Sequence, residues 1–197
     1  MVKQEIANRG HHRILSNLAS HDDEGALRVV VETPRGSRNK YDYNPDCDCM
    51  ELGAVLPEGM SFPYDFGFIP STLGEDGDPL DVLVLLDAPV VTGCVVMARP
   101  IGVIEARQKD KRGGWIRNDR LLAVAVHAHT HGKATDLHGL RPHLLAEIKA
   151  FFVDYNEQRN RKFEILRDRG PKAALKLIEA ARKACKAHSK KSGGAKR

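Results

Sequence analysis

The stretch STLGEDGDPLDVLVLLDAP, residues 71–89, places acidic side chains directly before an apolar run. Within seven residues it holds four carboxylates, those of Glu75, Asp76, Asp78 and Asp81. The apolar run 82–86 follows at once, and a short apolar run bounded by turn residues predicts a buried strand. Carboxylates this close together repel one another unless some are protonated or a cation compensates them. The stretch therefore raises the question of what stabilises four acids at the mouth of a strand.

The residues between these acids favour a tight turn. Gly77 permits a close turn of the backbone, and Pro79 restricts Asp78 to an extended conformation. Carboxylates held in this way suit a hard cation such as Mg²⁺, which binds through carboxylates, waters and substrate phosphates. An EF-hand is excluded, because the loop lacks the glutamate at its twelfth position. An ordinary acidic turn with solvated carboxylates stays equally open on spacing alone, since Asp-Gly and Asp-Pro are common in turns.

The pattern outside this stretch predicts a mixed fold. Strand-like runs rich in β-branched residues occupy 26–34, 39–45, 80–87, 93–106 and 119–129. The C-terminal third changes to helical spacing, with apolar side chains three and four residues apart between 144 and 155. A second helix is expected from Pro171 onward. Many short strands followed by helices predict an α+β fold with a small barrel or a strongly curled sheet.

Length and charge set the expected domain organisation. A chain of 197 residues is long enough for one domain with tails. We expect an N-terminal arm over 1–25, a folded domain over 26–185 and a basic, disordered tail over 186–197. Residues 182–197 carry seven Lys or Arg and no acid, which gives them a charge of +7. The net charge of the whole chain is +5, so the rest of the chain has a net charge of −2. Because the body is near neutral, nucleic-acid binding is not expected.

Targeting and redox signals are few. The N-terminus has no apolar signal-peptide core, and no run approaches the roughly 18 apolar residues of a membrane span, so we expect a cytoplasmic protein without membrane contact. Four cysteines do not make a disulfide framework in a chain this long. Cys47 and Cys49 form a Cys-x-Cys pattern that suggests a soft-metal site, but no second pair matches it. Free thiols are therefore the expectation.

The segment EDGDPLDVLVL resembles the signature of the soluble family I inorganic pyrophosphatases, in which Asp-x-Asp-Pro-x-Asp opens a barrel strand. The resemblance runs collinearly from about residue 28 to residue 163 through VVVETP, NKYDYN, SFPYDFGFIPSTLG, RPIGVIEA, RLLAVAV and FFVDYNEQRNRKF. It implies a five-stranded OB-like β-barrel with C-terminal helices packed outside. It also implies Mg²⁺-dependent hydrolysis of inorganic pyrophosphate to two phosphates, by a homo-oligomer that is a hexamer in bacterial members and a dimer in eukaryotic ones.

The resemblance also assigns roles to residues. The metal ligands it implies are Asp76, Asp81, Glu32, Asp42 and Asn118. It makes Asp78 the base that takes a proton from the attacking water. The residues it implies for holding phosphate oxygens are Lys40, Arg120, Tyr155 and Lys162. Together these assignments answer the opening question with metal ions that neutralise the acidic turn.

Several positions depart from the family pattern. Phenylalanines replace two tyrosines at Phe62 and Phe66, and Ala54 stands where the family has an arginine. The acidic pair expected after the 99–106 strand falls on Gln108 and Lys109. The lysine after the helical tyrosine is replaced by asparagine at 156, and Asn118 and Arg120 stand for an aspartate and a lysine. The cations of the loop 107–119 either replace the missing phosphate contacts or form a solvated hairpin, and the sequence leaves both open.

Two other classes of function stay as alternatives. One is a catalytically weak or inactive homologue that binds phosphate-rich ligands or a protein partner. The other is an RNA-associated OB-like module, which the low aromatic content of 6% disfavours, since single-strand binders stack bases on aromatic side chains. His127, His129 and His131 alternate along an extended segment, and we expect them to be surface histidines, not metal ligands.

Overall fold

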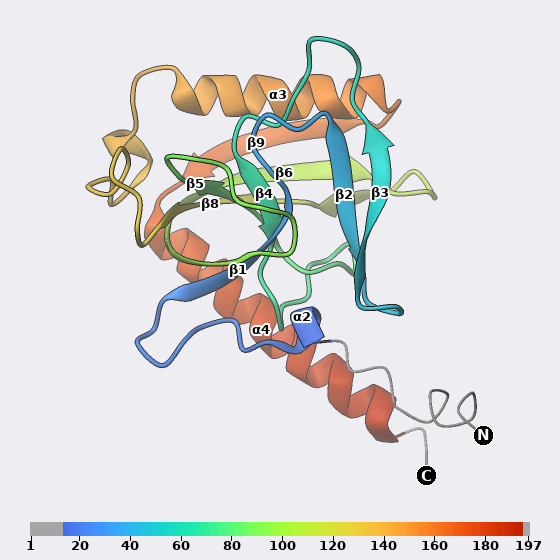
Figure 1. Ribbon diagram of the computed structural model, residues 1–197. Coiled ribbons are helices and arrows are strands. Elements are labelled where there is room, and N and C mark those ends of the chain that lie inside the picture. The colour runs from blue at the N-terminus through green and yellow to red at the C-terminus, as the bar shows by residue number, and fades with distance from the viewer. Residues whose placement is uncertain (1–13, 195–197) are drawn as a thin grey trace, which may run out of the picture.

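The computed structural model describes residues 14–194 (Figure 1). Its strands are β1 (Leu27–Thr33), β2 (Asn39–Asn44), β3 (Cys49–Val55), β4 (Asp65–Phe68), β5 (Asp81–Leu85), β6 (Val95–Lys109), β7 (Trp115–Arg117), β8 (Arg120–Ala125) and β9 (Phe163–Arg169). Its helices are α2 (Ile14–Asn17), the 3₁₀ turn η2 (Leu137–Gly139), α3 (Leu144–Gln158) and α4 (Pro171–Gly194). The predicted strand runs correspond to β1, β2, β5, β6 and β8, and both predicted helices are present. Strands β3, β4, β7 and β9 were not predicted, and β9 lies between the two long helices.

Five strands close into a barrel. The main sheet runs in the order β1-β4-β5-β8-β6-β7, and β1 also pairs with β6, so the ring returns on itself. Only β5 and β8 pair in parallel, and the other neighbours in the ring are antiparallel. Closure removes the free edges that would otherwise expose unpaired backbone groups. The predicted five-stranded barrel with helices outside is therefore confirmed.

The longest strand, β6, joins several parts of the fold. It pairs with β1, β8, β7 and β9 along its fifteen residues. Its register against β8 shifts between Pro100 and Gly102, where a proline that cannot donate a ladder hydrogen bond is tolerated. Its C-terminal half thus carries the β6–β7 hairpin and β9 beyond the closed barrel.

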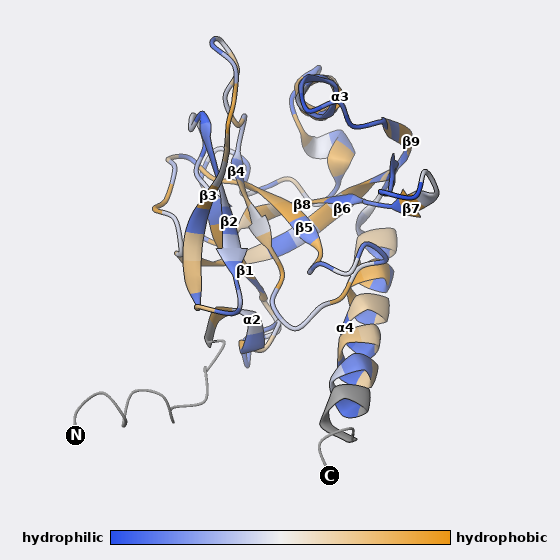
Figure 2. Ribbon diagram, turned by 90° about the vertical axis from the view of Figure 1, so that its right-hand side faces the viewer, coloured by the Kyte–Doolittle hydropathy of each residue, from blue (hydrophilic) through white to orange (hydrophobic). Residues whose placement is uncertain are grey.

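Both long helices pack on the outside of the barrel (Figures 1 and 2). Helix α3 buries Ile148, Phe152 and Tyr155, and α4 buries Ala174 and Ile178, each at helical spacing. Burial of such an apolar stripe is what stabilises a surface helix in water. No helix within residues 14–194 is long and apolar enough to cross a membrane.

Strands β2 and β3 form a separate hairpin beside the barrel mouth (Figure 1). All six residues of β2 are half-buried, so one side of this hairpin faces the rest of the protein. The register shifts between Lys40 and Tyr41, which bends the strand at the residue that the family resemblance assigned to substrate.

Two expected boundaries differ from the structure. Helix α4 continues to Gly194, so residues 186–194 are helical and are not part of a disordered tail. Their three lysines and Ala187 are good helix formers, and a reading based on charge alone missed this. The described part of the arm, residues 14–25, is also not loose, because Ser71 donates its backbone N–H to Ser16 O (3.0 Å) and its hydroxyl to Leu18 O (2.8 Å). Residues 1–13 and 195–197 lie outside the described residues.

Candidate active site

The acidic turn between β4 and β5 is held by its own backbone. The N–H of Gly74 donates to the carbonyl of Asp78 at 2.7 Å, and the N–H of Asp78 donates to Asp76 Oδ1 at 3.3 Å. Gly77 adopts a φ of +93°, a conformation that L-residues rarely adopt. Asp81 then opens β5. The turn therefore presents three carboxylates together, as its glycine and proline predicted.

These carboxylates form part of the wall of a cavity of about 580 Å³. Other parts of the wall come from β1, β2, the residues that open β8, and α3. Nine of the ten residues that the family resemblance assigned line this cavity: Asp76, Asp78, Asp81, Glu32, Lys40, Asp42, Asn118, Arg120 and Tyr155. Segments from residue 32 to residue 155 thus converge on one space, which the order of the sequence alone does not require.

Lys162 is the residue that the structure does not bring to the cavity. Its side chain is exposed, and its carbonyl accepts a hydrogen bond from the N–H of Lys109 at 2.9 Å. The neighbouring Arg161 lines the cavity instead. The chain between α3 and β9 turns at Asn160, which has a φ of +54°. Of the two cations that follow this turn, Arg161 lines the cavity and Lys162 does not. The assignment of Lys162 to the site is therefore not supported by its position.

Arg120 is a buried cation at the floor of the cavity. It is 5% exposed, and its Nη1 donates to Asp81 Oδ2 and to Asn118 Oδ1. Its guanidinium carbon lies 5.1 Å from the ring centroid of Phe152 and 6.0 Å from that of Phe66. Aromatic faces attract a cation, and they also exclude water from it. Within residues 14–194, Arg120 Nε is buried without a hydrogen-bond partner, so this side chain has donor capacity left.

Lys40 provides the second cation near the carboxylates. Its ammonium pairs with Asp42 and lies 5.7 Å from the ring centroid of Phe66. A Cβ at Gly53 would lie 1.7 Å from Asp42 Oδ2, so the glycine on the facing strand leaves room for the carboxylate. The β2–β3 hairpin thereby holds this ion pair against the barrel.

Burial perturbs the acids of the cavity. It raises the pKa of Glu32 to about 7, against the opposing effects of Lys40 and of a 2.8 Å hydrogen bond from the N–H of Tyr43. Burial and then the charge of Asp81 raise the pKa of Asp76 to about 6. Burial also raises the pKa of Asp81, although Arg120 opposes it. Carboxyl groups with raised pKa values are those that gain most from a cation bound beside them.

The charges that line the cavity favour cation binding. Five of the lining residues are acids, whereas three are Lys or Arg, namely Lys40, Arg120 and Arg161. Oxygen donors of this kind fit hard divalent ions such as Mg²⁺. The lining also holds one thiol, Cys185, and one imidazole, His188, which are too few for the four ligands of a structural zinc site. The residues present therefore fit a hard divalent metal.

We expect the metal-free protein to lose stability as the pH rises from about 4.5 to about 7. The folded pKa of Glu32 lies above its ordinary value of 4.5, so its stabilising contribution is complete below 4.5 and is lost as the pH climbs through about 7. The loss should be at most about 3.5 kcal/mol, at roughly 1.4 kcal/mol per pKa unit. Denaturant unfolding in chelator, at about pH 5 and about pH 8, measures it. A Glu32→Gln variant cannot titrate there, so an equal decline in both proteins would contradict this assignment.

The loop after β6 does not supply cations to the cavity. Arg107 pairs with Glu164 at 2.7 Å and lies 4.5 Å from the ring centroid of Trp115, on the β6–β7 hairpin. Arg117 donates to both oxygens of Asp119 at 2.8 Å. None of the loop cations Arg107, Lys109, Lys111, Arg112 and Arg117 lines the cavity. Pairing of β7 and β9 with β6 places most of these cations away from the cavity, whereas Arg117 lines a neighbouring hollow beside Asp76 and Asp81. The position of the loop therefore gives the hypothesis that it replaces missing phosphate contacts little support.

The acids in and beside that loop are also engaged elsewhere. Asp119 accepts the N–H of Ala106 at 2.8 Å, and Asp110 accepts two backbone N–H groups of its own turn. Glu105 pairs with Arg167 at 2.7 Å. A neighbouring hollow of about 320 Å³ shares Asp76, Asp81 and Asn118 with the cavity and continues toward α4. Gln108 itself lines the cavity, and Glu105, Asp110 and Asp119 do not.

One part of the wall was missed by sequence reasoning. Cys185, His188 and Ser189 on the last turns of α4 line the cavity. The helical spacing of apolar residues after Pro171 was the signal for a helix, and its alanines and lysines continue past Cys185. The basic composition of the end of the chain concealed this.

A model of one known family, described as inorganic pyrophosphatase, matches residues 29–186. The chain belongs to the inorganic pyrophosphatase family. Among its relatives, an inorganic pyrophosphatase of Synechocystis sp. is 38% identical over 165 residues, which cover 84% of this chain and 95% of the relative. A protein of Chlamydomonas reinhardtii named soluble inorganic pyrophosphatase 2 is 37% identical, over 81% of this chain and 80% of the relative. The predicted family is thereby confirmed.

Solved structures of the family have the same fold. The inorganic pyrophosphatase of Thermus thermophilus superposes with a TM-score of 0.78 at 33% identity, covering 87% of this chain and 98% of that one. The enzyme of Helicobacter pylori gives 0.77 at 32% identity, covering 86% and 98%. The chain therefore has the fold of the family over most of its length.

The departures of this pyrophosphatase from the family pattern have a local explanation. Phe62 and Phe66 lie 5.5 Å apart between ring centroids, and both are buried. Phe62 also packs against Phe151 and Tyr155, at 5.1 and 5.8 Å. A hydroxyl buried without a partner in such a cluster would cost free energy, which suits phenylalanine at both positions. Ala54 pairs with Lys40 across β2 and β3, so that neighbour of the cavity adds no charge.

The three histidines are surface residues, as expected. His127 and His129 are exposed in the turn after β8, and His131 is half-buried with its ring edge toward Tyr64 at 6.3 Å. The N–H of His129 donates to Asp87, which holds this turn at the end of the barrel. They take no part in the cavity.

Proposed function

We propose that this protein hydrolyses inorganic pyrophosphate to two phosphates with the help of divalent metal ions, Mg²⁺ first among them. The observation that carries the proposal is the meeting of the acidic turn with two enclosed cations, Lys40 and Arg120, around one cavity. Membership of the inorganic pyrophosphatase family and the names of the relatives support the same substrate.

The metal ligands in this proposal are oxygen donors that share the cavity: Asp76, Asp81, Glu32, Asp42 and Asn118. When bound, divalent ions lower the pKa of coordinated water and neutralise phosphate oxygens. Because acids outnumber Lys and Arg in the lining, an anionic substrate would be repelled from the metal-free cavity. Binding of pyrophosphate should therefore depend on divalent metal as strongly as turnover does.

In this proposal, side chains of the cavity accept the proton of the attacking water and bind the phosphates. Asp78 stands on the turn between the two metal-binding aspartates, where its carboxylate can accept the proton of an attacking water. Lys40 and Arg120 can donate to phosphate oxygens, and charge-assisted hydrogen bonds of this kind stabilise charge that develops on a leaving phosphate. Tyr155 accepts a hydrogen bond from Arg159, which orients its hydroxyl at the wall.

Release of phosphate from pyrophosphate, with Mg²⁺ and with chelator, tests the proposal. We expect two phosphates per pyrophosphate consumed in Mg²⁺ and no turnover in chelator. Absence of phosphate release in Mg²⁺, Mn²⁺ and Co²⁺ alike would overturn the proposal and favour the weak or inactive homologue.

The end of α4 gives a prediction about substrate affinity. Deleting residues 187–197 removes His188 and Ser189 from the wall, and we expect the KM for pyrophosphate to rise by about three- to tenfold, as for one lost hydrogen bond of about 0.5–1.5 kcal/mol. Deleting only residues 191–197 keeps both side chains and serves as the matched control. Steady-state kinetics on both truncations measure the difference. Equal KM values would show that the end of α4 has no part in substrate binding.

Assembly and compartment belong to the same proposal. We propose a cytoplasmic homo-oligomer, hexamer or dimer. The four free cysteines are consistent with a reducing compartment. Large apolar side chains are exposed at Leu52, Val55, Val91 and Leu175, which offers contact surface for further subunits. Light scattering during size-exclusion chromatography measures the subunit number, and a monomer at micromolar concentration would contradict this part.

A further inference from the structure

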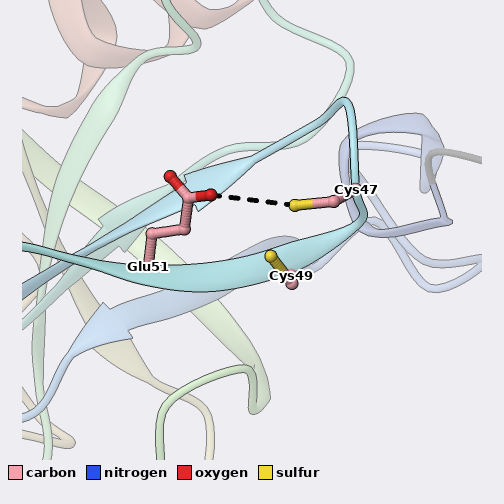
Figure 3. Close-up of side chains that lie close together, drawn as sticks. All are labelled: Cys47, Cys49 and Glu51. Atoms are coloured by element: carbon pink, nitrogen blue, oxygen red, sulfur yellow. Dashed lines mark hydrogen bonds between the residues drawn. The ribbon is translucent and has the colours of Figure 1, made fainter.

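The closed end of the β2–β3 hairpin carries two thiols and a carboxylate. Cys47 lies in the connecting turn, and Cys49 and Glu51 lie on β3 (Figure 3). Their ligand atoms all lie within 4.8 Å of one another, and Cys47 Sγ is 3.9 Å from Glu51 Oε1. Within residues 14–194 this is the only group of three or more such side chains that meets that spacing. Both thiols are free and exposed to solvent.

We propose that this cluster binds one soft or borderline divalent metal ion of the Zn²⁺ class through Cys47, Cys49 and Glu51. Zinc bonds to sulfur at about 2.3 Å and to carboxylate oxygen at about 2.0–2.2 Å, so tetrahedral ligands lie roughly 3.5 Å apart. The 3.9 Å between Cys47 Sγ and Glu51 Oε1 is close to that separation, and small rotations of exposed side chains complete the approach. Water supplies the fourth ligand.

The hairpin holds these ligands in a defined frame. Asn44 Nδ2 donates to Glu51 Oε1 at 2.8 Å, and Asn44 Oδ1 accepts the N–H of Asp46 at 2.8 Å. Asp48, between the two cysteines, adopts a φ of +52°, and its carboxylate accepts the hydroxyl of Tyr43 at 2.5 Å. The turn that separates the thiols is therefore fixed by contacts on both sides, which reduces the entropy lost on metal binding.

Ligand chemistry separates this site from the cavity. Thiolates select soft and borderline ions, whereas carboxylates without sulfur suit Mg²⁺. Binding displaces one proton from each thiol to solvent and forms two metal–sulfur bonds, so the ion's two charges replace two protons. The pKa of the Cys49 thiol is raised to about 11, first by its hydrogen bond with Cys47, so this thiol keeps its proton until a metal displaces it.

The two sites share the hairpin but not their residues. Glu51 pairs with Asp42 across the strands, and Asp42 lines the cavity. A metal at the end of the hairpin would hold the strand that carries Lys40 and Asp42 without contacting either. The inference therefore stands whether or not the protein hydrolyses pyrophosphate.

Titration of the full-length, untagged protein with Co²⁺ tests the site. The protein is kept reduced with a phosphine under anaerobic conditions, and Mg²⁺ in excess occupies the oxygen ligands. We expect a thiolate-to-cobalt charge-transfer absorption in the near ultraviolet that saturates at one Co²⁺ per chain. Zn²⁺ should then displace the cobalt and abolish the absorption.

Matched variants test which cysteines give rise to the charge-transfer absorption. Cys47→Ser with Cys49→Ser should abolish it, whereas Cys94→Ser with Cys185→Ser should keep it. Glu51→Gln should keep the absorption but weaken cobalt affinity by about tenfold or more, the scale found for altered ligand surroundings. No absorption in the reduced wild type, or an unchanged absorption in the Cys47/Cys49 double variant, would overturn the proposal. Phosphate release in Mg²⁺ should be unaltered in that double variant, so failure here is distinguishable from failure of the proposed hydrolysis.

Discussion

Replacing Asp81 by asparagine is expected to lower the turnover of pyrophosphate by about 10³-fold or more, the scale on which loss of one electrostatic contact at a reacting centre is felt. Asparagine has nearly the same shape and can still accept the hydrogen bond from Arg120, so the fold should persist. What it removes is the negative charge that the proposed metal requires. Mg²⁺ titrations of phosphate release should show the loss as a fall in both metal affinity and turnover.

Asp87→Asn is the matched control for this variant. Asp87 follows the same strand at its other end, where its carboxylate accepts the N–H groups of His129 and Thr130 at 2.7 and 2.8 Å. It does not line the cavity. The control should lose some stability but keep its turnover. Wild-type rates in Asp81→Asn at every Mg²⁺ concentration would show that the acidic turn is not the metal site.

Replacing Arg120 by methionine is expected to lower kcat/KM for pyrophosphate by about 10- to 150-fold. The guanidinium is enclosed by aromatic rings, where a charge-assisted hydrogen bond to a phosphate is worth about 1.5–3 kcal/mol. Methionine fills the same apolar surroundings without a charge, so packing against Phe152 and Phe163 should be kept. Steady-state kinetics at saturating Mg²⁺ measure the effect.

Metal affinity separates a phosphate contact from a structural role. Arg120 is an ion-pair partner of Asp81, so its removal deletes a positive charge beside the proposed metal site. Mg²⁺ should therefore bind the methionine variant at least as tightly as the wild type, while pyrophosphate binds more weakly. Arg120→Lys should restore part of the loss, because it keeps the charge but not the planar fork of donors. Equal loss of metal and substrate affinity in the methionine variant would contradict the phosphate role.

Local sequence patterns predicted a large part of this structure. The apolar runs and their turn residues predicted β1, β2, β5, β6 and β8, because alternation and β-branching act over a few residues. Gly77 and Pro79 predicted the turn that holds Asp76, Asp78 and Asp81 together, since backbone restrictions are a property of each residue. The family resemblance extended this to distant positions, and nine of its ten residues line one cavity.

Other features depended on contacts between distant segments. Arg161 and Lys162 are adjacent cations in the sequence, and the turn at Asn160 places Arg161 at the cavity. The cations of the loop 107–119 were candidates for the site because of their charge alone. Pairing of β6 with β7 and β9 keeps them out of the cavity lining, and Arg107 and Arg117 instead form ion pairs with Glu164 and Asp119.

The sequence by itself therefore determined four of the five barrel strands, the acidic turn and the family, because each depends on short-range rules or on a collinear set of motifs. The remaining barrel strand, β4, lies in a segment rich in Gly and Pro that local rules do not mark as a strand. Only the tertiary structure decided which cations face the cavity, that α4 reaches its wall, and that Cys47, Cys49 and Glu51 meet at the end of a hairpin. The physical reason is that the direction of a side chain follows from register and packing. Both arise from strand pairings and helix contacts between residues far apart in the chain, which composition and local spacing do not encode.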